Sequence, residues 1–118
     1  MLYSVIINQL ADAGIDVALP GAKQEICLAP YAVVQRSGTY HYAQSERLGY
    51  SLISVHCYTP LQSYDMLDDL IERVKSALKS LEPDLRPVGN ESPHIINDKF
   101  RAHEASIDYY FQRRTVLS

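Results

Sequence analysis

The stretch from Tyr50 to Leu81 changes its hydrophobic period partway along, and this change restricts the fold more than any other feature of the chain. Between residues 50 and 58 the side chains alternate in polarity, which is the pattern of a half-buried β-strand. From Ser63 onward the apolar residues recur at the spacing of one face of an amphipathic helix. The chain must therefore place a strand and then a helix against one core.

The alternation also fixes which face of the strand each residue occupies. Ile53, Val55 and Cys57 fall on one face. His56 and Tyr58 fall on the opposite face. A nucleophile and its base must approach within about 3 Å of each other, which adjacent residues on a regular strand do not do. We therefore predict that His56 and Cys57 form no catalytic dyad, and that Cys57 is a buried core thiol.

The predicted helix from about 63 to 81 carries its own end signals. Ser63 can cap its N-terminus, and Lys75 and Lys79 lie near the negative end of the helix dipole. Near the positive end lie Asp65, Asp68 and Asp69. These carboxylates have no histidine partners and lack the spacing of a calcium-binding loop. We therefore expect no metal site and no cofactor.

The flanking segments complete a single α+β domain that spans residues 1–118. Residues 2–13 repeat at helical spacing, and Gly14 follows as a C-cap. Strand-like segments, rich in β-branched or aromatic residues, are 26–28, 31–35, 50–58, 85–88 and 104–112. This order of elements predicts an antiparallel or mixed β-sheet with two helices packed on one face.

Two segments are expected to lie apart from this core. Residues 37–49 are polar, bounded by glycines and rich in tyrosine, which predicts an extended hairpin arm, and residues 112–118 are expected to form a mobile C-terminal tail. The chain has nine tyrosines and no tryptophan. Tyrosine is enriched at protein interfaces, so these side chains are candidates for contacts with a partner. The alternative is a tyrosine-rich sheet packed inside its own subunit.

Composition and motifs exclude several classes of protein. The net charge of −3 includes no basic cluster of the kind that binds nucleic acid. Two cysteines, Cys27 and Cys57, and the lack of a signal-peptide pattern indicate a reducing, cytosolic compartment. The apolar runs are too short to span a membrane. The sequence has no glycine-rich phosphate loop, no serine nucleophile elbow and no cysteine-histidine metal-binding motif. His94 and His103 belong to no ligand pattern, so we expect no enzymatic activity.

Three segments of the chain together resemble a known family of proteins. The segments are PYAVVQ, YSLISVHCYTPLQSYDMLDDLIERVKSALKSL and IINDKFRAHEASIDYYF. They are similar to the small tail-completion or tail-terminator proteins of long-tailed bacteriophages, also described as head-to-tail joining or minor structural proteins. The similarity covers residues 28–112. It rests on an apolar strand closing in tyrosine and proline, an amphipathic helix, a proline-rich link and a final alternating strand.

The resemblance implies a structural α+β subunit that assembles into a ring, commonly a hexamer. Such a ring caps the tail tube and joins it to the head connector in a virion assembled in the host cytoplasm. The expected partners are further copies of the chain, the tail tube protein and head-completion proteins, with no membrane. DNA is expected to pass through the ring without specific binding. The resemblance brings no catalytic residues.

A closed ring needs two different patches on each subunit. The residues expected at these patches lie in the arm and on the polar side of the strands: Tyr40, Tyr42, Arg47, Tyr50, Tyr58, Glu104, Asp108 and Arg113. Two alternatives stay open. The first is a small ligand-binding or enzymatic domain that uses His56, Tyr58 and Tyr110 on a shared sheet face. The second is a monomeric adaptor that binds one partner.

Overall fold

The structure is a computed structural model that describes residues 2–18, 27–41, 48–62, 65–81, 85–92 and 94–114, with the backbone alone for 2–3, 36–41, 48–51, 89–91 and 112–114. The helices and strands in these ranges are α1 Leu2–Asp12, β1 Val17–Ala18, β2 Tyr31–His41, β3 Leu48–Pro60, α2 Met66–Lys79, β4 Leu85–Glu91, β5 Ile95–Asn97 and β6 Ala102–Arg114.

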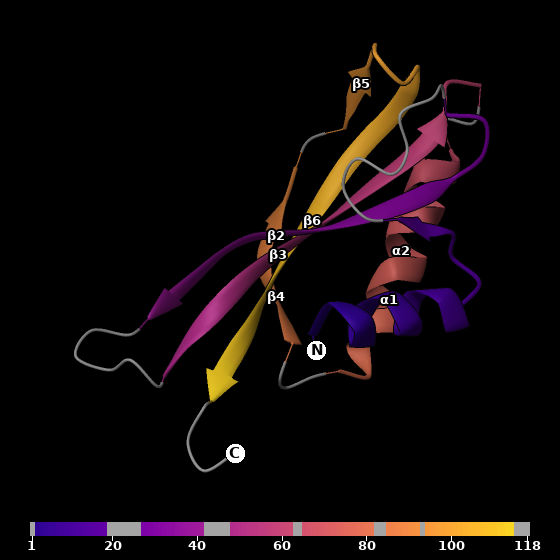
Figure 1. The fold of residues 1–118 in the computed structure, drawn as a ribbon. Helices are drawn as coiled ribbons and strands as arrows, with labels where there is room; N and C mark the ends of the chain where they lie inside the picture. Colours follow the sequence, from indigo (N-terminus) through magenta and orange to yellow (C-terminus); the bar gives the residue numbers. More distant parts are fainter. Residues whose placement is uncertain are drawn as a thin grey trace.

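The strands form one mixed sheet in the order β1-β2-β3-β6-β4, and β5 also pairs with β6. β1 runs parallel to β2, and the other pairings described are antiparallel. Both helices pack on the same face of the sheet, as Figure 1 shows. This arrangement confirms the predicted α+β class with two helices on one face.

The helix α2 supplies the largest share of the helical side of the core. Its buried residues follow the predicted helical stripe: Leu67, Leu70, Val74 and Leu78. Asp68 and Asp69 lie in its first turn and Lys79 in its last turn, where their charges favour the helix dipole. The helix begins after Asp65, and Ser63, which we expected to be the cap, lies outside the described residues.

The helix α1 packs beside α2 along a narrower stripe than the sequence predicted. Ile6 and Leu10 are fully buried, whereas Val5 and Ala13 are exposed. The helix ends at Asp12, and Gly14 follows in the closing turn with a φ of 82°, which glycine adopts without steric cost. The prediction of a helix closed by this glycine is therefore confirmed.

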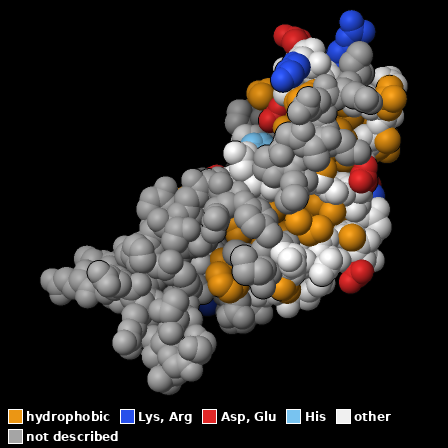
Figure 2. All heavy atoms as spheres, in the orientation of Figure 1, with side chains coloured by type: hydrophobic (Ala, Val, Ile, Leu, Met, Phe, Trp, Pro, Cys, Tyr) orange, Lys and Arg blue, Asp and Glu red, His pale blue; other side chains and the backbone are white. Residues whose placement is uncertain are grey.

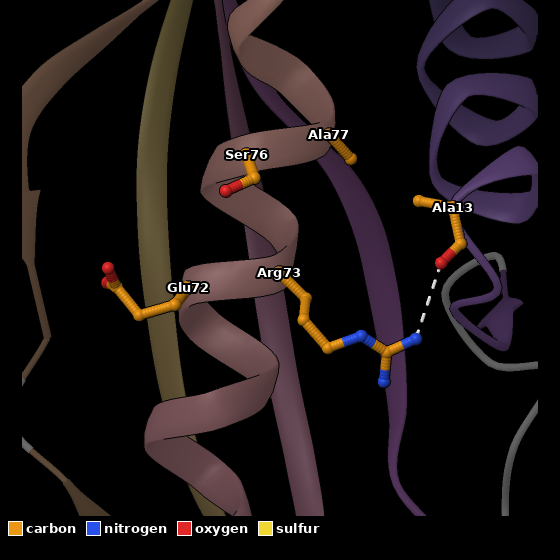
Figure 3. A pocket seen from close by; sticks show the side chains of 5 residues that line it. All are labelled: Ala13, Glu72, Arg73, Ser76 and Ala77. Atoms are coloured by element: carbon orange, nitrogen blue, oxygen red, sulfur yellow. Dashed lines mark hydrogen bonds between the residues drawn. The ribbon is translucent and has the colours of Figure 1, made fainter.

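Arg73 of α2 ties the two helices together at this end. Its Nη2 donates to the carbonyl oxygens of Ala13, at 3.3 Å, and Gly14, at 3.2 Å. Figure 3 shows the guanidinium pointing from α2 toward Ala13, beside an open hollow of about 400 Å³ that Glu72 and Ala77 also line. Because Arg73 satisfies carbonyls left over at the end of α1, its visible role is structural.

The sheet alternates as the sequence predicted. Ile53, Val55 and Cys57 of β3 are buried under the helices. The same core contains residues from the neighbouring strands β2 and β6: Ala32, Val34, Ala105, Ile107 and Tyr109. The central strand is therefore buried through its odd-numbered residues, and its even-numbered residues lie on the opposite face of the sheet.

The structure differs from the predicted elements at several places. Strands β1 and β5 were not expected, and Cys27 and Leu28, expected in a strand, lie outside one. Residues 112–114, expected to begin a mobile tail, instead belong to β6, because Gln112, Arg113 and Arg114 pair with β3. Residues 115–118 lie outside the described part of the chain.

Candidate subunit interface

Three strands continue beyond the part of the sheet that the helices cover. We call this part, residues 36–41 of β2, 48–52 of β3 and 110–114 of β6, the three-stranded extension (Figure 1). Its strands are paired along their length, with one register shift between Arg36 and Gly38: β2 and β3 pair as far as His41 and Gly49, and β6 follows β3 to the Leu48–Arg114 pair. The extension contributes to the elongated dimensions of the molecule, 49 × 25 × 25 Å.

In the part of the chain that the structure describes, no strand pairs with the outer edge of β2 along the extension. β1 pairs only with Ala32 and Val33, and the described residues supply no strand partner on that side of residues 34–41. The Ala32 N–H donates outward to Asp16 in a 2.8 Å bond. Regular alternation from Ala32 to Arg36, the last residue before the register shift, directs the Arg36 N–H the same way. An edge of this kind offers backbone donors and acceptors to another chain.

The opposite edge of the sheet is formed by two short strands. β4 and β5 pair with different parts of β6, with a register shift between Pro87 and Glu91. Ile95 is 50% exposed and Ile96 is 59% exposed, although both are large apolar residues. We call these two residues the apolar edge. Figure 2 shows apolar side chains close to basic and acidic ones at the upper end of the molecule, where β5 lies.

The sheet face away from the helices carries a second, smaller core. Tyr31 and Tyr58 are buried there with Cys27 and Ala102, and Phe100 packs against them. The two tyrosine rings stack with centroids 5.0 Å apart, and Phe100 meets Tyr58 edge-on at 6.0 Å. Tyr58 is only 9% exposed, which corrects the expectation that its ring faces a partner. Cys27 and Phe100, which cover the two tyrosines, come from segments that are distant from each other in the sequence.

The environment of this small core shifts the acidity of both tyrosines. Burial, followed by the negative charge of Glu104, raises the pKa of Tyr58 to about 12. Burial is also the largest cause that raises the pKa of Tyr31 to about 12, and Cys27 and Glu104 add to it. Both phenols are therefore neutral across the physiological pH range.

Polar side chains occupy the same face farther along the strands. The Glu104 carboxylate lies 3.6 Å from His56 Nδ1 and accepts a 2.9 Å hydrogen bond from Asn97 Nδ2. Ser54 Oγ donates to Asp108 at 2.8 Å. Glu104 and Asp108, two expected interface residues, are therefore half-buried and already engaged within their own chain.

Two groups of residues are candidates for catalysis: the adjacent pair His56 and Cys57, and the shared sheet face of His56, Tyr58 and Tyr110. Cys57 is fully buried on the helix side of β3, and burial raises the pKa of its thiol to about 12, so the prediction of a buried core thiol is confirmed. His56 lies on the other face, with its Nδ1 toward Glu104. Tyr110 pairs with Leu52, four residues along β3 from His56, which separates them by about 13 Å. His56, Tyr58 and Tyr110 therefore share a face without converging.

The other expected interface residues lie in or near the three-stranded extension. Tyr40 pairs directly with Tyr50, and Arg113 pairs with Gly49, in backbone register. Tyr42 and Arg47 lie outside the described residues. The apolar edge was not predicted from the sequence, although the apolar pair before the Asn97–Asp98 turn residues is a strand-and-turn signal.

The described residues contain neither a metal-binding cluster nor a membrane-spanning helix. No group of three or more histidine, cysteine, aspartate or glutamate side chains among them is arranged to hold a metal ion. None of the helices described is both long enough and apolar enough to cross a membrane.

No known protein family matches the chain, and no curated protein sequence matches it either.

Proposed function

We propose that this chain is a structural subunit of a long-tailed phage virion, a ring-forming tail-terminator or tail-completion protein. In this role it caps the tail tube and joins it to the head connector. The observation that carries the proposal concerns the described residues, in which no strand pairs with the outer side of β2 beyond Val33 or with the outer side of β4. The sequence resemblance over residues 28–112 supplies the biological setting.

The two edges suit a head-to-tail interface. The open edge of β2 and the apolar edge at β5 are different surfaces, which is what a heterologous interface requires. Pairing the β2 edge of one subunit with the β4–β5 side of the next continues the sheet from subunit to subunit, and closure after six copies makes the hexamer. Main-chain hydrogen bonds then supply affinity, and Ile95 and Ile96 lose exposed apolar surface.

The three-stranded extension is the candidate contact with an adjoining ring. It projects from the body of the subunit, and its strands carry the positions of Tyr40, Tyr50 and Arg113. The net charge of −3 favours a lumen that repels the phosphates of DNA in transit and does not grip them.

A shortened arm tests the role of the extension. Deleting residues 39–47 joins Gly38 to Leu48, and because Gly38 pairs with Leu52, residues 48–51 can form the new hairpin loop. Particles assembled with this variant should lack correctly joined tails in electron micrographs. Headed particles with tails of normal length would contradict the role of the extension. Far-ultraviolet circular dichroism of the purified variant controls for folding.

A second candidate function rests on the polar row opposite the helices. The His56–Glu104 approach, with Asn97 fixing the carboxylate, is an arrangement in which a histidine can bind or move a proton. A ligand-binding or enzymatic domain of this kind would be independent of ring assembly. Loss of ligand binding or turnover in His56→Ala, with assembly unchanged, would favour it over the structural role. A monomeric adaptor is separated from both by its mass in solution.

A further inference from the structure

The rings of His94 and His103 meet at the beginning of β5, where the sequence had placed both residues apart. Nε2 of His94 lies 2.8 Å from Nδ1 of His103, and the ring planes cross at 72°. His94 precedes β5, and His103 lies in β6 opposite Ile96. The register of the β5–β6 pairing therefore brings together two imidazoles that are separated by nine residues.

The tautomer of His103 follows from its second contact. Its Nε2 lies 2.9 Å from the carbonyl oxygen of Leu61, and a carbonyl can only accept, so Nε2 carries a hydrogen. In the neutral ring Nδ1 is then a lone pair aimed at His94. Histidines that bind metals usually donate their other ring N–H to a carboxylate or a backbone carbonyl in this way.

We propose that His94 and His103 form a two-histidine site for a borderline divalent transition-metal ion, with Zn²⁺ as the reference ion. Imidazole nitrogen is a preferred ligand for Zn²⁺, Cu²⁺ and Ni²⁺. Zinc–nitrogen bonds in tetrahedral geometry place two ligand nitrogens about 3.3 Å apart, so the rings need to separate by about 0.5 Å and to turn until both lone pairs converge on the ion. His94 is exposed, so water can reach the ion and fill its remaining positions.

The proton balance of binding is simple. The hydrogen on His94 Nε2 moves to Nδ1 of the same ring, and the freed Nε2 lone pair binds the ion. His103 keeps its Nε2 hydrogen on the Leu61 carbonyl. The neutral pair therefore takes the ion without a net loss of protons. The ion then links β5, β6 and the turn after β3 at one point.

Titration of the purified, tag-free chain with ZnCl₂ in a calorimeter tests the site at neutral pH. We expect saturable binding of one ion per chain in the wild type, abolished in His94→Gln and retained in His56→Gln, the matched control. His94→Gln is preferred to a change at His103, which is only 7% exposed and whose loss can unfold the chain. Thermal unfolding gives a second measurement: Zn²⁺ should raise the Tm of the wild type and not that of His94→Gln.

Three results would overturn the proposal. Absence of saturable binding leaves the pair as a hydrogen bond only. Equal binding by His94→Gln places the ion elsewhere, and half an ion per chain with dimer formation means that the ligands come from two chains. The mass of the protein is measured in the same samples, so the number of ions per chain is known whether or not the chain forms rings.

Discussion

Tyr31 stacks on Tyr58 across β2 and β3, with ring centroids 5.0 Å apart and an angle of 21° between the planes. The pair lies on the sheet face opposite the helices, where Phe100 and Cys27 cover it. It forms a second core on a face that the sequence pattern marked as partner-facing. Its buried phenols have consequences for stability at high pH.

We predict that the chain loses stability as the pH rises above about 9. The pKa of Cys57 is raised from 9.0, and those of Tyr31 and Tyr58 from 10.0, each to about 12. The unfolded chain therefore releases these protons at lower pH than the folded chain, so stability is complete below pH 9 and declines toward pH 12. Urea unfolding across this range should show a shallower decline in Tyr58→Phe. Equal declines in both proteins would contradict the assignment.

Replacing Glu104 with glutamine should lower the pKa values of both tyrosines. Burial is the larger cause of their shifts, so the pKa values should fall only part of the way toward 10. The glutamine can still accept the hydrogen bond from Asn97. Titration of tyrosinate absorbance measures the effect, and Asp108→Asn, which changes the carboxylate bound by Ser54, is the matched control. An unchanged titration in Glu104→Gln would show that its charge does not reach the tyrosines.

The helix α2 should be the main anchor of the larger core. Leu70 is 2% exposed and Leu78 is 1% exposed. Changing either one to alanine should lower the free energy of unfolding by about 2–5 kcal/mol, the range for truncation of buried leucine. Met66→Ala, at a position 42% exposed in the same helix, should cost much less. Similar costs at all three positions in urea titrations would contradict this packing.

The two cysteines should be unreactive in the folded chain. Cys57 is 0% exposed and Cys27 is 4% exposed, and a buried neutral thiol is a poor nucleophile. A thiol reagent should label both only after denaturant is added. Cys57→Ser should lower stability by about 1–3 kcal/mol, because it buries a hydroxyl among apolar side chains. It should leave assembly intact, as should His56→Ala, and rapid labelling of the native chain would overturn this description of Cys57.

The sequence predicted the elements whose burial is one-sided and long enough to repeat. The strand alternation at Ile53, Val55 and Cys57 and the helical stripe of Leu67, Leu70, Val74 and Leu78 are local patterns, and each matches the core. β1 and β5 have two and three residues, too few to display a period, and their pairing depends on the strands beside them.

The candidate sites were harder to predict because they depend on register. The contact between His94 and His103 requires the β5–β6 turn, in which Asn97 accepts from the Phe100 N–H and Arg101 adopts a positive φ of 50°. Alternation correctly separated Tyr58 from the helices. It carried no information about Phe100 and Cys27, which cover that face from distant positions.

Ring assembly through the open edge of β2 is the central claim, and one pair of variants at Arg36 tests it most directly. Proline at this position removes an N–H that alternation from Ala32 directs away from β3, at the last residue before the register shift, whereas alanine keeps that N–H and serves as the control. Native mass spectrometry and negative-stain imaging, on the chain alone and mixed with tail tubes, measure assembly. The wild type and Arg36→Ala should form hexameric rings, and Arg36→Pro should stay monomeric and folded. Rings of equal yield from Arg36→Pro, or a wild type that stays monomeric even with tail tubes, would contradict the claim.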